Sequence, residues 1–69
     1  MDKQTLTRDI KSSVNGSGFI NISQLAKYLR KSRENTASLL RGIDYVEVGR
    51  EKKYFIQDVA TRLLDMRRF

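Results

Sequence analysis

The fold of this chain depends most on residues 28–40 (YLRKSRENTASLL), which contain no glycine or proline to mark a break. Several core-type residues stay in phase along one helix from 24 to 41, namely Leu25, Leu29, Thr36 and Leu40. Ser32, however, is a strong N-cap residue, and Glu34 suits the positive end of a helix that begins just after it. These two residues favour two short helices joined by a turn, and one continuous helix is the alternative.

The length of the chain also favours a break. A helix from 24 to 41 would be about 27 Å long at the usual rise per residue, too long for the core of so small a domain to cover. The chain has 69 residues in all. Two short helices that cross steeply instead bury one shared set of side chains: Leu25, Ala26, Leu29, Thr36, Leu39 and Leu40. We therefore predict two helices, the second over residues 33–41.

A further helix and a short strand are predicted before this region. Apolar residues recur at every fourth position near the N-terminus, at Leu6, Ile10 and Val14. The helix that they indicate ends at residues 15–18 (NGSG), where the chain can take the left-handed conformation. Residues 19–22 suggest a very short extended segment. Ser23 is the predicted N-cap of the next helix, with Ile22 packed as a hydrophobic staple.

A β-hairpin is predicted after Gly42, because the apolar period changes there from about 3.6 residues to 2. If Val48 faces Tyr54, the apolar side chains of both strands share one face: Val46, Val48, Tyr54 and Ile56. A shift of one residue would mix apolar and polar side chains on each face, so the cleaner register is preferred. This register gives the hairpin a charged loop at residues 49–53.

The last predicted element is a helix over residues 57–68, with an apolar side formed by Val59, Ala60, Leu63, Leu64 and Met66. Asp58 lies near its start and Arg67 and Arg68 near its end, as the helix dipole favours. The predicted order is helix, short strand, helix, helix, β-hairpin, helix. The sequence thus indicates a mainly α domain with a small β-hairpin over residues 1–69.

The composition limits the chemistry that this chain can perform. It has no cysteine and no histidine, which removes disulfides, the usual zinc sites and most acid–base catalysis. We expect no catalytic residue, no metal and no cofactor. The net charge of +6 favours a polyanionic partner, either nucleic acid or an anionic membrane surface. No apolar run is long enough to span a membrane, and no signal peptide is recognisable, so a cytoplasmic protein is expected.

Two stretches, INISQLAKYLRKSRENTASLLRG and YVEVGREKKYFIQDVATRLL, resemble the small winged helix-turn-helix domains of phage and transposon excisionases. These domains are related to the DNA-binding heads of MerR-type regulators. The matching positions in the first stretch are Leu25, Ala26, Leu29, Ser32, Arg33, Leu39 and Leu40. Those in the second stretch are Val48, Gly49, Ile56, Asp58, Val59 and Leu63. The sequence departs from the family pattern at three positions. Lys31 stands where the pattern usually has an apolar residue, and Arg30 where it often has glycine. Thr36 occupies the usual β-branched position, where the pattern has valine.

The resemblance implies a winged helix-turn-helix fold that binds double-stranded DNA, with helix 33–41 in the major groove. With Thr36, Leu39 and Leu40 facing the core, the predicted base contacts are Arg33, Glu34, Asn35, Ala37, Ser38 and Arg41. For Glu34, capping of the helix dipole is an equal alternative. The wing, residues 49–53, would contact the backbone or minor groove through Arg50, Lys52 and Lys53. Lys27, Arg30 and Lys31 would add backbone contacts near the turn.

The resemblance also implies a role in excision of a mobile element, as an excisionase or recombination directionality factor. The expected protein partners are an integrase and a second copy of the chain on adjacent sites. A transcriptional regulator from the same kind of element is the alternative, since the fold does not distinguish them. No ligand-binding domain is evident, so no small-molecule ligand is expected. A protein-interaction module is the alternative from another class, with Phe55 and Phe69 as exposed apolar residues.

Overall fold

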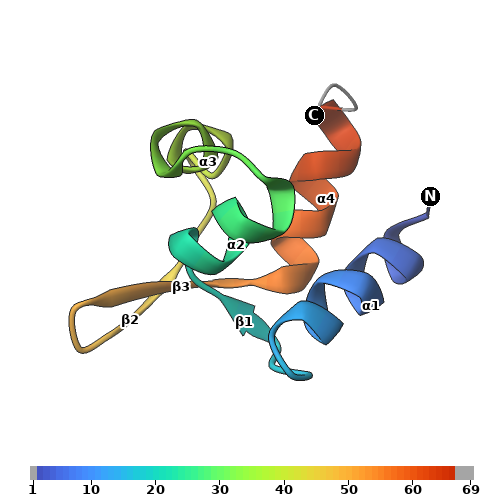
Figure 1. Ribbon diagram of the computed structural model, residues 1–69, viewed down its shortest axis with the longest axis horizontal. Helices are drawn as coiled ribbons and strands as arrows, with labels where there is room; N and C mark the ends of the chain where they lie inside the picture. Colours follow the sequence, from blue (N-terminus) through green and yellow to red (C-terminus); the bar gives the residue numbers. More distant parts are fainter. Residues whose placement is uncertain (1, 67–69) are drawn as a thin grey trace.

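The computed structural model describes residues 2–66, which are mainly helical with a small three-stranded antiparallel sheet (Figure 1). The elements are α1 (Lys3–Ser13), β1 (Phe19–Ile20), α2 (Ile22–Leu29), α3 (Arg33–Leu39), β2 (Val46–Val48), β3 (Glu51–Phe55) and α4 (Ile56–Met66). α1 packs against α4, α2 packs against α3, and β3 lies between β1 and β2 in the sheet. The predicted mainly α composition is confirmed, and the short first strand joins the hairpin in one sheet.

The chain breaks between α2 and α3, so the alternative of one continuous helix is wrong. Arg30 takes the left-handed backbone conformation, with a φ of 57°. The N–H of Lys31 donates to the carbonyl of Ala26 at 3.0 Å and closes the end of α2. Ser32 then caps α3 as predicted, its Oγ accepting a hydrogen bond from the N–H of Asn35 at 3.1 Å.

The three departures from the excisionase-like pattern each have a structural counterpart. Arg30 stands at the position that is often glycine, and its left-handed backbone is the conformation that glycine adopts most easily. Lys31 is exposed and contributes no apolar packing to the turn. Thr36 is fully buried in α3, and its Oγ1 donates to the carbonyl of Ser32 at 2.8 Å. The buried hydroxyl is therefore satisfied.

One core connects all four helices and the sheet. It contains Leu6, Ile10, Val14, Ile20, Leu25, Leu40, Tyr54, Ile56, Val59, Ala60 and Leu63. α1 is also tied to α2 at the surface, where the Tyr28 hydroxyl donates to the Asp9 carboxylate. Burial, together with this hydrogen bond, raises the pKa of Tyr28 to about 12. α1 ends as predicted, because Asn15 and Gly16 both have positive φ.

The predicted N-cap of α2 is wrong by two residues. Asn21 caps this helix, its side-chain oxygen accepting from the N–H of Gln24 at 2.7 Å. The side chain of Gln24 accepts in return from the N–H of Asn21 at 3.0 Å, which completes a capping box. Ser23 lies inside the first turn, and Ile22 is the first helical residue rather than a staple before the cap. The reciprocal Asn–Gln pair outcompetes the single hydroxyl of Ser23.

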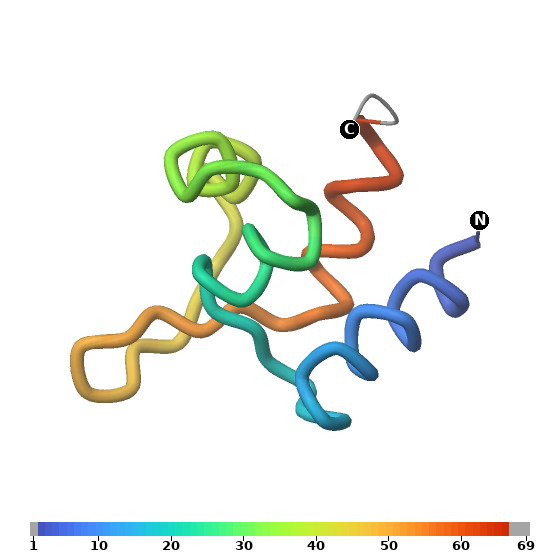
Figure 2. The backbone as a smooth tube through the Cα atoms, in the orientation of Figure 1, coloured from blue at the N-terminus to red at the C-terminus, as the bar shows by residue number. Residues whose placement is uncertain are grey.

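The predicted hairpin register is also wrong. Val48 pairs with Glu51 and Val46 with Lys53, so the loop holds two residues, Gly49 and Arg50, instead of five. Gly49 has a φ of +65° in the first position of this loop, as a type II′ turn requires. Alternation of apolar residues does not select the register here, because every residue of β2 is exposed. The hairpin extends away from the helices, and the turn sets its register (Figure 2).

The observed register places the apolar side chains of β2 on the surface. Val46 is 42% exposed and Val48 57% exposed, whereas Tyr54 on β3 is buried. Because directly opposed residues share a face, Val46 and Val48 lie with Lys53 on the sheet face away from Tyr54. Tyr54 pairs with Ile20 of β1 on the face that meets the core.

α4 begins at Ile56, directly at the end of β3, where the sequence suggested a strand residue. Ile56 is buried and its N–H donates to the carbonyl of Gly18 at 3.0 Å. Met66 is 41% exposed, so its predicted place on the apolar side of the helix is wrong. Arg67 and Arg68, expected at the helix end, and Phe69, expected to be exposed, lie outside the described residues.

Candidate functional site

The outer side of α3 and the β2–β3 hairpin are separated by two hollows. The first, called here the tip hollow, lies between the start of α2, Arg33 at the start of α3, and Arg50 and Lys52 of the hairpin. The second, called the inner hollow, is lined by Ala37, Ser38 and residues 40–43 on one side and by Tyr45, Lys52 and Tyr54 on the other. Lys52 lines both hollows, so they form one continuous surface along the hairpin.

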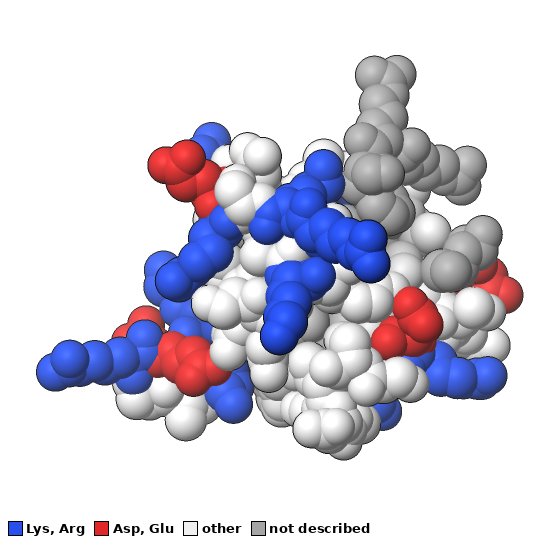
Figure 3. Space-filling model, viewed as in Figure 1, with Lys and Arg blue, Asp and Glu red and all other residues white. Residues whose placement is uncertain are grey.

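This α3–hairpin surface gathers half of the residues that the sequence suggested. They are Arg33, Ala37, Ser38, Arg41, Arg50 and Lys52, all exposed. Lys and Arg side chains gather over the half of the molecule that holds α2, α3 and the hairpin, with Asp and Glu at a few points among them (Figure 3). The surface therefore presents cations from two separate elements toward the same solvent space.

The remaining predicted contacts lie elsewhere. Glu34 and Asn35 are exposed on α3 but line neither hollow. Lys53 is half-buried on the opposite sheet face from Lys52, because successive residues of a strand alternate. Lys27, Arg30 and Lys31 are exposed around the turn between α2 and α3 and also lie outside both hollows. They flank the surface instead of forming it.

The extent of the predicted recognition helix needs a correction. α3 ends at Leu39 and not at residue 41, so Arg41 belongs to the turn that follows. The predicted wing loop also shrinks to Gly49 and Arg50, which leaves Lys52 and Lys53 within β3. Arg50 is then the single cation in the turn itself.

Tyr45 holds Lys52 in place, a role that is not evident from the sequence. The Lys52 ammonium lies 4.9 Å from the centre of the Tyr45 ring, a cation–π contact. The Tyr45 ring in turn lies 5.7 Å from the ring of buried Tyr54. The series links an exposed cation to the core, so Lys52 is less free to move than a lysine on an isolated hairpin.

Arg62 of α4 is a second residue that the sequence did not reveal. Its guanidinium donates to the carbonyl of Leu39 at 3.0 Å and to that of Arg41 at 2.8 Å. These carbonyls lie at the end of α3, where backbone acceptors lack helical partners and a cation is favoured. No periodic signal links positions that are more than twenty residues apart, so only the structure shows that α4 holds the end of α3.

Asn21 connects the hairpin to the start of α2. Its Nδ2 donates to the carboxylate of Glu51, the first residue of β3, while its Oδ1 caps α2. Glu51 is thus an acid among the cations of the tip hollow, and it holds the hairpin at a fixed place beside the two helices. This contact joins the hairpin to α2, and the Tyr45 contacts join the start of β2 to β3.

Comparison of the chain with protein-family models, curated proteins and solved structures gives no match. Within residues 2–66, no helix has the length and apolar character needed to cross a membrane. In the same part of the chain, no three metal-ligating side chains come together.

Proposed function

We propose that this chain is a non-enzymatic winged helix-turn-helix protein that binds double-stranded DNA. In this proposal α2 and α3 form the helix-turn-helix, α3 is the recognition helix, and β2 and β3 form the wing. The observation that carries it is the tip hollow, where Arg33 of α3 lies with Arg50 and Lys52 of the hairpin. Cations that converge from a helix and a hairpin suit the closely spaced phosphates of a duplex.

The position of each side chain suggests its role on DNA. Arg33 is exposed in the first turn of α3, where a recognition helix meets base edges, and it would contact guanine. Ala37, one turn further on the same side, would contact a thymine methyl group. Arg50 and Lys52 would bind phosphates or enter the minor groove. Lys27, Arg30 and Lys31 would bind flanking phosphates.

The more specific role proposed is an excisionase or recombination directionality factor of a mobile element. It rests on the resemblance of the sequence, and its partners would be an integrase and a second copy on an adjacent site. The same surface suits a transcriptional regulator, and binding to genomic DNA would place either protein at the nucleoid. An integrase gene beside this one would favour excision, whereas a divergent promoter carrying the binding site would favour regulation.

One observation favours a second class of function, a protein-interaction module. Phe55 is 47% exposed and stacks on Phe19, with ring centres 4.6 Å apart, on the sheet face away from the core. The exposed side chains of Val46 and Val48 lie on the same face. Exposed apolar residues gathered on one face are typical of protein contacts.

Selection of bound duplexes from a random DNA pool, followed by a gel shift, tests the DNA proposal. We expect a defined site whose log affinity falls with log salt at a slope near −4 to −5, since about five phosphates are neutralised. The double variant Arg33→Ala/Ser38→Ala should bind that site much more weakly. If the wild type selects no sequence and binds no more tightly than the variant at about 150 mM salt, the interaction module is the better explanation.

A further inference from the structure

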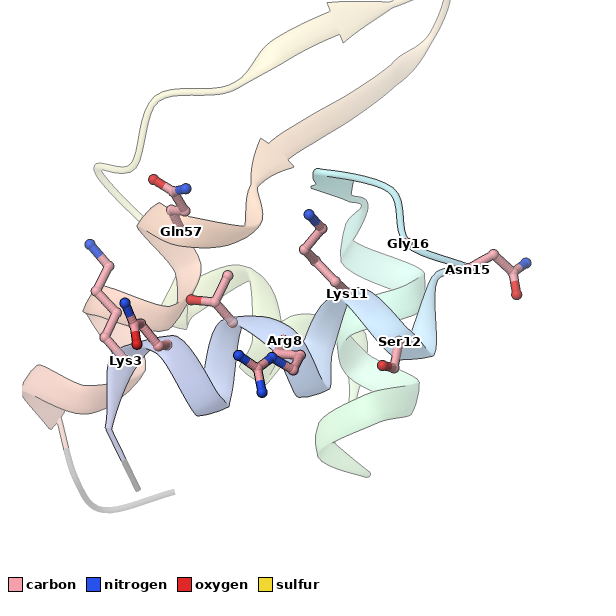
Figure 4. A pocket seen from close by; sticks show the side chains of 9 residues that line it. Lys3, Arg8, Lys11, Ser12, Asn15, Gly16 and Gln57 are labelled. Carbon is pink, nitrogen blue, oxygen red and sulfur yellow. The ribbon is translucent and has the colours of Figure 1, made fainter.

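α1 carries a second basic surface, distinct from the α3–hairpin surface. Lys3, Arg8 and Lys11 line a hollow along the outer side of this helix, together with Gln57 from the start of α4 (Figure 4). The lining shares no residue with the tip hollow or the inner hollow. We call the three cations the α1 row.

The acidic and the basic side chains of α1 and its cap lie on different sides of the helix. The acidic residues are engaged elsewhere: Asp2 caps the helix by accepting from the N–H of Thr5, which lowers the pKa of Asp2. Asp9 faces α2, where it accepts from Tyr28. No aspartate or glutamate lines the hollow, whose neutral members are hydroxyl and amide side chains and one glycine.

The cations of the α1 row are available to a ligand. Lys3, Arg8 and Lys11 are all exposed, and none forms an ion pair within the described residues. Arg8 contributes to the lowered pKa of Asp2 without direct pairing. The neutral side chains around the row, such as Gln4 and Gln57, add hydrogen-bond donors that suit phosphate oxygens. The row extends about 12 Å along the helix, which matches three to four phosphates of one DNA strand.

The row lies at the other end of the molecule from the α3–hairpin surface. The hairpin and α1 occupy opposite ends of the long axis, whose extent is 33 Å (Figure 1). A duplex held by α3 and the hairpin would therefore leave the row free. From this arrangement we infer that the α1 row binds the phosphate backbone of a second duplex segment, so that one molecule bridges two DNA segments. This inference rests on the proposed DNA binding at the first surface.

A membrane surface fits the row less well. Interfacial helices insert apolar side chains between lipids, besides placing basic residues near headgroups. The apolar residues of α1, Leu6, Ile10 and Val14, are buried in the core, so none is left to insert. A duplex backbone needs only cations and hydrogen-bond donors, which are what this side of α1 offers.

A two-duplex capture assay tests the inference. A biotinylated duplex on beads is mixed with the protein and with a second, fluorescent duplex, and the retained fluorescence measures bridging. We expect the variant Lys3→Gln/Arg8→Gln/Lys11→Gln to lose at least tenfold in bridging while its single-duplex affinity in a gel shift changes less than threefold. The matched variant Arg33→Gln/Arg50→Gln/Lys52→Gln removes the same charge and should lose both activities.

Further measurements separate the outcomes. When the α3–hairpin surface is saturated with the first duplex, capture of the second duplex should have a salt slope near −2 to −3, shallower than single-duplex binding, because the three cations of the row neutralise fewer phosphates. Lys3→Arg/Lys11→Arg, which keeps the charge, should keep bridging. The unchanged single-duplex affinity of the glutamine variant shows that its loss of bridging is not a folding defect. A wild type that shifts single duplexes but does not bridge overturns this inference alone, whereas one that shifts no duplex overturns the proposed function as well.

Two other results would also overturn the inference. Equal bridging by the wild type and the α1-row variant would show that another surface joins the duplexes. Binding to vesicles of phosphatidylserine and phosphatidylcholine that needs the row, without any bridging, would assign the row to a membrane surface.

Discussion

The α2–α3 segment and the β2–β3 hairpin both contribute to the proposed DNA surface but are stabilised in different ways. Leu25, Thr36 and Leu40 of the helical segment are buried, and Arg62 fixes its end from α4. In the hairpin, only β3 reaches the core, through Tyr54 and its pairing with β1. Every residue of β2 is exposed, and this outer part of the hairpin is held by its turn, by Tyr45 and by the Asn21–Glu51 contact. The helices are thus fixed by burial and the outer part of the hairpin by a few local contacts.

This difference has a functional meaning. A recognition helix must present side chains to bases at a fixed angle, which requires rigid support from the core. A wing that binds phosphates tolerates some movement, because charge attraction is less directional than a hydrogen bond to a base. We therefore expect mutations in the helical segment to change global stability and sequence specificity together. Mutations of the exposed side chains of the hairpin should change affinity with little effect on stability.

Truncation of matched apolar residues should give the largest contrast. Leu25→Ala removes a fully buried side chain from α2 and should cost about 2–5 kcal/mol in the free energy of unfolding. Val48→Ala, at a 57% exposed position on the hairpin, should cost less than about 0.5 kcal/mol. Urea unfolding followed by circular dichroism measures both. Equal costs would show that β2 is packed against a part of the core.

The loss of Arg62 should have the next largest effect. Arg62→Met keeps much of the apolar stem but leaves the carbonyls of Leu39 and Arg41 without their charged donor. Hydrogen bonds to charged groups contribute about 1.5–3 kcal/mol, and the partial exposure of this site favours the lower end. Affinity for the selected DNA should fall in the same variant, although Arg62 lies outside the DNA surface. Wild-type stability in Arg62→Met would contradict a supporting role.

The difference between buried helices and an exposed β2 also explains which features the sequence predicted. The break at Ser32 was predictable because an N-cap acts through its own neighbours and because one long helix would exceed the core of so small a domain. The hairpin register was not predictable, because the apolar side chains of β2 are exposed and no buried face determines the register. The contact of Arg62 with α3 was hidden because it depends on how α4 packs. The role of Asn21 was visible in its spacing to Gln24, but Ser23 was a competing signal.

The two serines near the helix starts test the capping assignments. Ser32→Ala should cost about 1 kcal/mol, because the N–H of Asn35 loses its acceptor. Ser23→Ala is the matched control, since Ser23 lies inside the first turn of α2 and caps nothing. Its effect should stay within about 0.5 kcal/mol. A larger loss at Ser23 than at Ser32 in thermal unfolding would mean that the caps are assigned wrongly.

Substitution of the turn glycine should act on the hairpin alone. Gly49→Ala places a side chain at a φ of +65°, where no atom obstructs it but the backbone conformation itself costs about 1 kcal/mol. Hydrogen exchange should speed up in β2 and β3, with at most a small change in global stability. Gly18→Ala, at a glycine without positive φ and with open space around it, is the control. Equal protection of the hairpin in both variants would argue against the two-residue turn.

The smallest expected effect is the pH dependence of the stability that Tyr28 contributes where it links α2 to Asp9 of α1. The folded pKa of Tyr28 is raised to about 12 from a reference of 10.0, so the folded state holds this proton more tightly. The resulting stability is complete below pH 10 and is lost as the pH rises toward 12. The difference in melting temperature between the wild type and Tyr28→Phe should therefore shrink from pH 9 to pH 12. Because the hydroxyl contact lies at the surface, the shift should be smaller than that of Ser32→Ala. A constant difference across this range would mean that neither burial nor the hydrogen bond to Asp9 raises the pKa of Tyr28 in solution.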